Sequence, residues 1–427
     1  MNTAVRRNLL VLCIAALASA CSTSAPTGSP ATPGASPTPS TTPATAPTSP
    51  PTLTVGVLVP FTESAINSEL GVAQQRAAEL YLKQQGGKLA GRDVNLVSSD
   101  ESITGSLDVV KAKQLVETDG AEVLLGLIGT DGAYAVRTYV DGKHVVFIDT
   151  NASGNALTRD VAGCSPSCKS RYLFRSSYSA WQLSEPLGEW AAKKGATQFY
   201  VLSSSDTFGI ESAAAFVEGL KTQGAAATAV VAAAAGTDWA RVVDAIAVQP
   251  TKDVFAAFAL SDAEGFIGAW DQAHLSAKGY KLYGPGPLTD VDVLAKVKAA
   301  AAGVTTASFW SSALDNPQNS ALMALFTKTY QDESGNPVPA DSYVVQMWDG
   351  MTALDHALQK TNGSTEGDAL AAALEGVSFN SPRGPFAFDK DTHNVVENIY
   401  IRQADASGVS VSNAIIDTIK AVSDPGK

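Results

Sequence analysis

The feature that most restricts the fold is an alternation of short β-rich runs with helical segments, which occurs twice. The first series begins with a buried strand expected at Thr54–Val59 and a helix expected at Val72–Gln85. After Ser176 the alternation starts again, with a strand expected at Phe199–Leu202 and a helix at Ile210–Leu220. Strands that alternate with helices over short connections predict parallel sheets covered by helices on both faces. Two such series predict an α/β protein with two doubly wound parallel-sheet lobes.

The remaining elements of both series follow the same periodicities. They are strands at Asp93–Val97, Val123–Leu127, Val145–Ile148, Ala229–Val231 and Asp253–Phe258, and helices around Val109–Val116 and Ala263–Ala273. In open α/β sheets, ligands bind beyond the carboxyl ends of the strands. With two lobes, we expect the ligand site in the cleft between them.

The first residues of the chain are typical of an export signal. Arg6 and Arg7 precede the apolar run Leu9–Leu17, which is too short to span a membrane, and small residues then lead to Cys21. The segment Leu17–Cys21 resembles the lipobox of bacterial lipoproteins, in which the signal is removed before a cysteine that then carries acyl chains. We therefore expect a signal peptide over residues 1–20 and a lipid on Cys21, which anchors the protein to the extracytoplasmic side of a membrane. The alternative is an ordinary secretory signal whose final cysteine has no such role.

Residues 21–52 are expected to form a disordered tether. From Ser22 to Pro51 the chain consists of Ser, Thr, Pro, Ala and Gly, without a charged or aromatic residue. Such a composition cannot bury enough apolar surface to offset the entropy of ordering the chain. The segment should therefore stay extended and hydrated between the anchor and the folded body.

The cysteines divide between processing and structure. Of the four, Cys13 is expected to leave with the signal, and Cys21 is the expected lipid site. Cys164 and Cys168 remain in the sequence Cys-Ser-Pro-Ser-Cys, and export permits a disulfide between them. A zinc site is the alternative, but no histidine lies near enough in sequence to complete an obvious ligand set. The histidines are His144, His274, His356 and His393. We expect the disulfide and no metal.

Charge and motifs exclude several classes of function. The formal net charge of −12 argues against a nucleic-acid partner, because phosphate binding needs a basic surface. Motifs of a hydrolase nucleophile elbow, a zinc peptidase or a phosphate-binding loop do not occur in the sequence. The polar strand end Ser203–Asp206 has no histidine close in sequence, although one from elsewhere in the fold could still reach it. We therefore expect no enzyme and no cofactor, with an exported enzyme as the alternative.

Six motifs in the body of the chain resemble, in order, those of one family. They are Val57–Phe61 with Gly71 and Arg76–Leu80, Leu89–Val97, Phe174–Ser177 with Gln182, Asp206–Gly209, Tyr343–Gly350, and Gly384–Asp389. Through these motifs the chain resembles the type I periplasmic binding proteins of the branched-chain amino acid (Leu/Ile/Val) receptor group, which are solute receptors of ABC importers. The resemblance spans approximately residues 53–403.

The resemblance implies two lobes joined by a three-segment hinge, with a ligand cleft between them. The implied crossings lie near Ser176, near Trp310–Ser311 and near Phe386. Residues 53–176 and 311–386 would then form lobe 1, and residues 177–310 and 387–427 would form lobe 2. A solute contacts both lobes only when the hinge closes, and the added contacts shift the population toward the closed form.

The function that the resemblance implies is capture of a small solute and its delivery to the permease subunits of an ABC transporter. The solute would be a branched-chain or other amino acid, an amide or a small carboxylate, and the receptor would be a monomer. The alternative is a ligand-sensing receptor that presents its closed form to a signalling partner, since one fold serves many functions.

The resemblance places part of the solute site at two strand ends of the first lobe. The expected contacts there are Gly129, Thr130, Asp131, Asn151, Ala152 and Ser153. The first three offer backbone N–H groups at a helix start and a hydroxyl, which together attract a carboxylate. The Asp131 carboxylate would repel such an anion, so a helix cap is the alternative for this residue. The last three are expected to offer a backbone group and a hydroxyl, with an Asx or Ser turn as the alternative.

The expected contacts from the second lobe are Phe208, Leu260, Ser261 and Gly286. Phe208 would pack on the apolar part of the solute, or, as the alternative, form a hydrophobic staple for the helix that follows. Leu260 and Ser261 follow a strand end that faces the cleft. Gly286 stands where similar amino acid receptors have a glutamate that pairs with the ammonium group of the ligand. Without that glutamate an α-amino acid loses its charge partner, which is costly in a desolvated cleft. Residues that could replace it are Asp131, Glu63, Glu69 and Asp290.

Overall fold

The computed structural model describes residues 51–62, 65–102, 105–160, 169–408 and 410–426. The expected signal peptide, the lipid site Cys21, nearly all of the tether and the cysteine pair Cys164 and Cys168 lie outside these residues. Ser49–Lys427 forms one compact unit. No helix in the described ranges combines the length and the apolar character needed to cross a membrane.

A six-stranded sheet forms the centre of the first lobe, in the order β2-β3-β1-β4-β5-β6. β1 pairs in parallel with β3 and β4, β5 and β6 extend the parallel part, and β2 adds an antiparallel edge. The strands are β1 (Leu53–Val59), β2 (Lys88–Leu89), β3 (Arg92–Asp100), β4 (Val123–Gly126), β5 (Val146–Asp149) and β6 (Leu173–Arg175). β1 is a nearly continuous apolar run and is almost wholly buried, as expected for a parallel strand covered on both faces.

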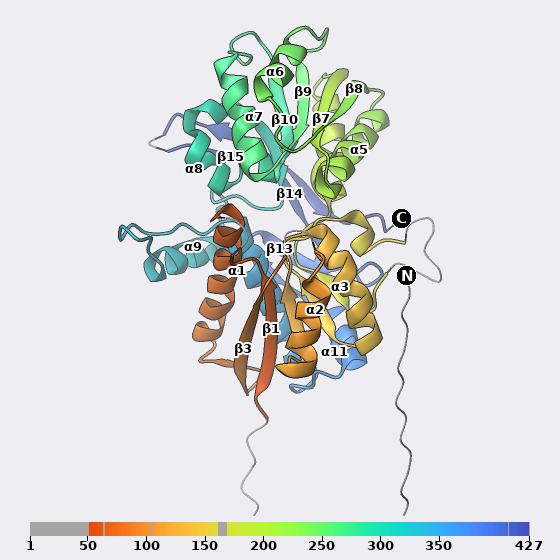
Figure 1. Ribbon diagram of the computed structural model, residues 1–427, viewed down its shortest axis with the longest axis vertical. Helices are drawn as coiled ribbons and strands as arrows, with labels where there is room; N and C mark the ends of the chain where they lie inside the picture. Colours follow the sequence, from red (N-terminus) through yellow and green to blue (C-terminus); the bar gives the residue numbers. More distant parts are fainter. Residues whose placement is uncertain (1–50, 63–64, 103–104, 161–168, 409, 427) are drawn as a thin grey trace, which may run out of the picture. The chain divides into compact units, whose positions relative to one another are not determined.

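Helices cover both faces of this sheet (Figure 1). Val55 and Val57 of β1 pack into the apolar cluster of α1 and α10, whereas Leu58 packs into that of α2 and α3. Alternate side chains of β1 therefore contact different helical layers on the two faces of the sheet. The helices are α1 (Ala65–Gln84), α2 (Asp108–Lys113), which continues as the π-helical turn Gln114–Thr118, α3 (Thr130–Lys143), α10 (Ser342–Lys360) and α11 (Gly367–Leu374).

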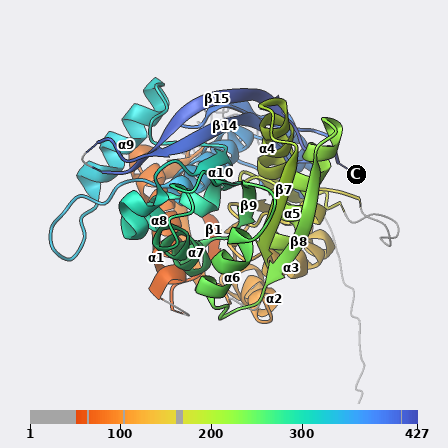
Figure 2. The same cartoon turned by 90° about the horizontal axis from the view of Figure 1, so that it is seen from above.

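A nine-stranded sheet has the order β12-β13-β14-β11-β10-β9-β7-β8, with β15 paired to β14. Its part from β11 to β8 forms the centre of the second lobe, and at the other end Phe388 of β13 contacts Phe174 of β6 in the first lobe. The run from β8 to β11 is parallel, and the remaining pairs are antiparallel. Figure 2 shows β14 and β15 side by side as two long strands. The strands are β7 (Gln198–Ser204), β8 (Ala226–Ala233), β9 (Asp253–Ala257), β10 (Lys281–Pro285), β11 (Thr305–Ser308), β12 (Ser378–Ser381), β13 (Gly384–Phe388), β14 (Val395–Asp405) and β15 (Ser412–Val422).

The helices of the second lobe begin at recognisable caps. Ser179 and Gln182 form a reciprocal capping box at the start of α4, and the Asp206 side chain caps α5 by accepting the Gly209 N–H group. α4 and α5 pack closely because glycines lie at their contact: a Cβ atom on Gly219 would lie 2.0 Å from the backbone oxygen of Glu185. The helices are α4 (Ala180–Lys193), α5 (Thr207–Thr222), α6 (Trp239–Ala247), α7 (Leu260–Gln272) and α8 (Val291–Val297). α9 (Pro317–Thr329) follows β11, and Tyr330 at its end donates a hydrogen bond to the backbone oxygen of Arg76 in α1.

The two doubly wound lobes predicted from the sequence are confirmed, and the described chain passes between them at three places. β6 ends at Arg175 in the first sheet, and α4 begins at Ala180 beside the second. After β11 the chain leads through α9 to α10, which packs on α1. β14 makes the third passage, because it pairs with β13 at one end and with β11 further along. The residue boundaries given above for the lobes stay a prediction.

A cluster of buried charges joins these three passages. The Arg383 guanidinium donates to the backbone oxygens of Ser176 and Ser177 at the first passage, over 2.7 and 3.1 Å. It lies 4.3 Å from the ring centre of Phe309 at the second. It also pairs with Asp349 of α10 and Glu397 of β14, at 2.6 and 2.7 Å. All three charged side chains have no exposed surface, so each depends on the others for its stabilisation.

Candidate ligand-binding cavity

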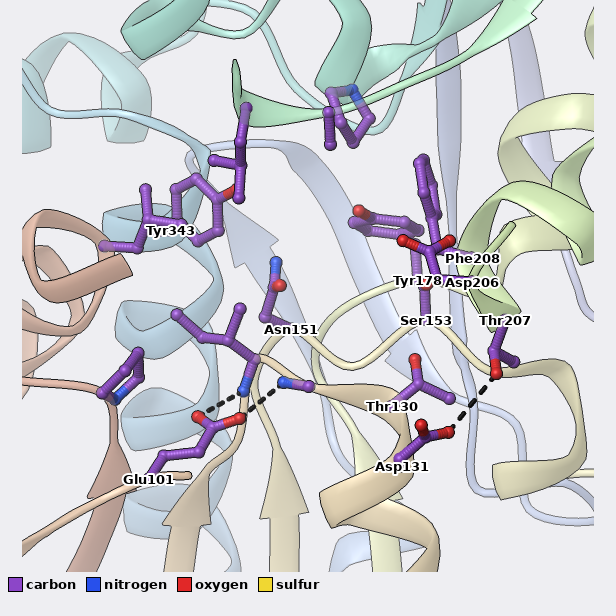
Figure 3. Close-up of a pocket in the computed structure, with 17 residues that line it drawn as sticks. Glu101, Thr130, Asp131, Asn151, Ser153, Tyr178, Asp206, Thr207, Phe208 and Tyr343 are labelled. Atoms are coloured by element: carbon purple, nitrogen blue, oxygen red, sulfur yellow. Dashed lines mark hydrogen bonds between the residues drawn. The ribbon is translucent and has the colours of Figure 1, made fainter. Parts of the chain in front are cut away.

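A cavity of about 280 Å³ lies where the carboxyl ends of strands from both sheets meet (Figure 3). Its first-lobe side comes from the segments that follow β1, β3, β4 and β5, and its second-lobe side from those that follow β7, β9 and β10. This is the position at which open α/β sheets bind ligands. The lining residues are Pro60, Leu70, Glu101, Ile128, Gly129, Thr130, Asp131, Asn151, Ser153, Tyr178, Asp206, Thr207, Phe208, Ala259, Leu260, Pro287 and Tyr343.

Three hydroxyl groups that reach the cavity from buried residues have no hydrogen-bond partner among the described residues. They belong to Ser153, Tyr178 and Tyr343, whose exposed fractions are 5%, 5% and 6%. Burial raises the pKa of both tyrosines above its ordinary value, so their hydroxyls stay protonated. A buried polar group without a partner costs free energy, and a bound solute would supply that partner. These hydroxyls therefore mark where the polar group of a ligand fits.

Glu101 occupies the backbone donors that precede α3. Its carboxyl oxygens accept the N–H groups of Ile128 and Gly129, over 2.8 and 2.6 Å (Figure 3). Burial raises the pKa of Glu101 to about 8; these two hydrogen bonds oppose that shift, and nearby Asp108 and Asp149 add to it. The sequence predicts that the N–H groups of this turn hold a ligand carboxylate. The structure corrects this for Gly129, whose N–H group is already bonded within the protein.

Asp131 lies in the first turn of α3 but does not cap it, since the cap residue is Gly129. Its carboxylate instead accepts a hydrogen bond of 3.3 Å from the Thr207 hydroxyl at the start of α5. Thr130 beside it also lines the cavity. Asp131 therefore makes a contact between the two lobes at the edge of the cavity (Figure 3).

The turn after β5 combines structural and cavity-facing groups. Asn151 lines the cavity, and its amide donates to Gln346 of α10 over 2.9 Å. Ala152 is buried outside the lining, and its N–H group donates to the Asp149 carboxylate over 2.8 Å. An Asx turn is therefore present here, but the Asp149 side chain forms it rather than Asn151 or Ser153, and Ala152 does not offer its N–H group to the cavity.

The second lobe places two of its four predicted residues in the lining. Phe208 lies in the first turn of α5 and faces the cavity, beside the labelled carboxylate of Asp206 (Figure 3). Leu260, the first residue of α7, lines the cavity with a left-handed backbone (φ 53°). Ser261 is exposed and lies outside the lining. Leu260 and Ser261 are adjacent at the start of α7, but the first lies in the cavity lining and the second on the exposed surface.

Gly286 also lies outside the lining, and its surroundings leave no room for a side chain. A Cβ atom there would lie 2.7 Å from the Ser308 hydroxyl, and the Gly286 carbonyl accepts a hydrogen bond from buried Arg402. The neighbouring Pro287 lines the cavity instead. A glutamate at position 286 would therefore require the backbone to move.

The residues proposed as replacements for the missing glutamate differ in placement. Asp290 caps α8 and accepts a hydrogen bond from the Ser342 hydroxyl, so it serves the structure. Glu69 is exposed and does not line the cavity, and Glu63 lies outside the described residues. Asp131 alone of the four is in the lining.

The family model for periplasmic binding proteins matches residues 52–409. The chain belongs to the periplasmic binding protein family. The match covers both lobes of this periplasmic binding protein, including every segment that lines the cavity.

Curated relatives place this periplasmic binding protein in the type I branched-chain amino acid receptor group. Leu/Ile/Val-binding protein homolog 6 of Brucella suis is 26% identical over 377 residues, which cover 87% of this chain and 93% of the relative. The protein of the same name from Brucella abortus is 26% identical over 376 residues, with the same coverage.

Solved structures of solute-binding proteins share the fold. One, from an ABC transporter of Rhodopseudomonas palustris BisB5 in complex with 3,4-dihydroxybenzoic acid, is 28% identical, with a TM-score of 0.79 and coverage of 88% of this chain and 99% of that one. Another from R. palustris, in complex with benzoate, is also 28% identical, with a TM-score of 0.77 and coverage of 88% and 98%. A leucine-binding protein from Thermotoga maritima is 12% identical with a TM-score of 0.73, over 86% of this chain and 99% of that one.

Sequence reasoning missed several cavity residues of this periplasmic binding protein. Tyr343 stands at the start of a motif that carried the resemblance, and Tyr178 directly follows another. Glu101 and Asp206 each follow the end of a strand, where ligand-facing residues of this fold gather. Their positions could have been noted from the sequence, but the inward direction of each side chain depends on the packed structure.

Proposed function

We propose that this periplasmic binding protein is the lipid-anchored, extracytoplasmic solute receptor of an ABC importer. It captures one small solute and delivers it unchanged to the permease. The resemblance implies an amino acid, an amide or a small carboxylate, and the cavity itself decides the chemical class. The observation that carries the proposal is the cavity, because both lobes line it and its buried hydroxyls lack partners. Its volume of about 280 Å³ is near the lower end of ligand pockets and suits a solute of amino acid size.

Contacts between the lobes support a mechanism of hinge closure. Besides the pair of Asp131 and Thr207, the Asn155 N–H group donates to Glu211 of α5 over 2.6 Å. Opening the lobes would break these bonds, so they favour the closed form. A solute that touches both lobes adds to them and shifts the population further toward closure. The permease would then distinguish the loaded receptor by its closed form.

The anchor in this proposal rests on the sequence. The apolar run before Cys21 and the segment Ser22–Pro51 support export, acylation and a hydrated tether. Relatives in the type I family are extracytoplasmic receptors, which agrees with this location. Mass spectrometry of the purified protein should find an acylated N-terminal Cys21, and an unmodified Cys21 would contradict the anchor while leaving the receptor role intact.

The receptor role is tested by binding and by the fate of the solute. A thermal-shift screen of the purified protein against amino acids, amides, amines and small carboxylates should find a stabilising solute. Stabilisation by mass action amounts to about 2.7 kcal/mol at a solute concentration of 100 times Kd. Chromatography should recover that solute unchanged. Chemical conversion of the solute, or no stabilisation by any member of the screen, would contradict the proposal.

Replacing Ser153 with alanine should weaken binding of the solute found in that screen by about 1 kcal/mol or more, because its buried hydroxyl faces the cavity without a partner. Isothermal titration calorimetry measures the change. Ser261→Ala is the matched control, since this serine is exposed outside the cavity and its removal should leave the affinity unchanged. Equal affinities of the Ser153→Ala variant and the unaltered protein would remove Ser153 from the site.

A further inference from the structure

The charge of the solute can be inferred from the cavity, if the proposed receptor function holds. A solute carboxylate would need hydrogen-bond donors or a cation. The donors that precede α3 are the N–H groups of Ile128 and Gly129, and both are bonded to Glu101. The Glu101 carboxyl group therefore lies where the sequence predicts the carboxylate of the solute.

The charges around the cavity also disfavour an anion. Among the described residues of the lining, none is Lys, Arg or His. The exposed side chains of Asp131 and Asp206 carry carboxylates, and burial raises the pKa of the Glu101 carboxyl group to about 8. Burial, and after it the negative charge of Asp206, raise the pKa of Asp262 in the first turn of α7. An anion that enters this cavity could accept hydrogen bonds from the hydroxyls of Ser153, Tyr178 and Tyr343, but it would gain no cationic partner and would lie near two carboxylates, which costs free energy. A cation would gain partners instead.

The remaining groups of the lining suit a cation with an apolar body. Figure 3 shows the Asp206 carboxylate beside Tyr178 and Phe208. One oxygen of that carboxylate accepts hydrogen bonds from the Ser204 hydroxyl and the Gly209 N–H group, each of 2.8 Å. An ammonium group can donate to the other oxygen and to the free hydroxyl oxygen of Tyr178. The aromatic faces of Tyr178, Phe208 and Tyr343 attract a cation and cover an apolar body.

We infer that this cavity selects a small monoamine, a protonated amine on an aromatic or branched apolar body without a free carboxylate. The ammonium group lies against Asp206 with Asp131 nearby, and the buried hydroxyls bind its remaining N–H donors. The relatives in complex with 3,4-dihydroxybenzoic acid and benzoate hold anions, so this chain differs from them in the charge that it recognises.

Calorimetry with solutes that share one skeleton tests the inference on the purified protein. The first set is benzylamine, benzamide and benzoate, and the second is isopentylamine and leucine. The amine should bind most tightly in each set. Asp206→Asn should weaken amine binding by about tenfold, the effect of removing a charged hydrogen-bond partner, and should leave benzamide unchanged. Asparagine caps helices as well as aspartate, so α5 should keep its start.

Asp238→Asn is the matched control, because Asp238 caps α6 in the same way and does not line the cavity. Its amine affinity should equal that of the unaltered protein, and Asp131→Asn provides a second cavity variant if Asp206→Asn does not fold. Tighter binding of benzoate, benzamide or leucine, or an unchanged amine affinity in both cavity variants, would overturn the inference and leave the receptor function standing. Failure of every solute in the wider thermal-shift screen would instead overturn the receptor function.

Discussion

Replacing Arg383 with methionine should lower the free energy of unfolding by about 3–5 kcal/mol, the range found when one partner of a buried ion pair is removed. The variant leaves Asp349 and Glu397 fully buried without their cation, and it removes the donors to the backbone at Ser176 and Ser177. Methionine fills much of the volume of the arginine side chain. The loss in free energy of unfolding therefore comes mainly from the missing charge and hydrogen bonds and less from altered packing. Because Arg383 joins three passages between the lobes, this is the largest effect that we expect of a single side chain.

The loss in the Arg383→Met variant should grow as the pH rises from about 5 to 8. In the unaltered protein, burial already raises the pKa of Glu397 to about 7 and raises that of Asp349, while Arg383 opposes both shifts. Without the arginine both pKa values rise further. A carboxyl group whose pKa is higher in the folded than in the unfolded state stabilises the fold fully when the pH is below its unfolded pKa. It loses that contribution as the pH rises through its folded pKa. The variant is therefore least stable at a pH high enough for both carboxyl groups to ionise.

Urea unfolding at several pH values measures this loss. Arg241→Met is the matched control, because Arg241 pairs with Asp238 on the surface, where the two side chains are 88% and 59% exposed. That change should alter the free energy of unfolding by less than about 0.5 kcal/mol. A loss of similar size in the two variants would show that the buried cluster contributes no more than a surface pair.

Replacing Gly219 with alanine should destabilise the protein by about 3 kcal/mol, since it inserts a methyl group into a closed contact. The new Cβ atom would lie 2.0 Å from the Glu185 carbonyl oxygen of α4, which is backbone and cannot rotate away. On the facing helix, a Cβ atom on Gly188 would lie 2.4 Å from the Phe216 oxygen, so α4 and α5 meet through glycine on both sides. Relief therefore requires the two helices to separate.

Gly268→Ala is the control for the Gly219 substitution, and its effect should have the opposite sign. Gly268 lies within α7, and a Cβ atom there meets nothing within 4 Å. Alanine should stabilise this helix by about 0.5–1 kcal/mol, because it has less conformational entropy to lose. Thermal unfolding compares both variants with the unaltered protein. A stabilised Gly219→Ala variant would contradict the close packing of α4 on α5.

The elements with strong periodicity were predictable from the sequence. The strand expected at Thr54–Val59 is confirmed at Leu53–Val59, and the helix expected at Ala263–Ala273 is confirmed at Leu260–Gln272. The first helix was predicted to begin at Val72 and begins seven residues earlier, at Ala65. Gly71 directly precedes the predicted start, and a glycine within a helical pattern is usually taken as an end or a break, although Ile66 and Leu70 continue the apolar sequence pattern of the helix.

The cavity was predictable to the level of strand ends and no further. Parallel strands direct their carboxyl ends to one edge, so Thr130, Ser153 and Phe208 could be expected near one another. The departures have tertiary causes. Ala152 is held by Asp149, and Gly286 is enclosed by Ser308 and Arg402, which are distant from it in sequence. Local spacing carries no information about such partners.

The sequence by itself determined the class of fold, the two lobes and the family, because apolar periodicity and short motifs are local properties of a chain. Only the tertiary structure decided which charges meet. Arg383, Asp349 and Glu397 converge at the passages between the lobes, and Glu101 takes the donors before α3. Burial and proximity set the energies of these groups, and both arise only when segments far apart in the chain pack together.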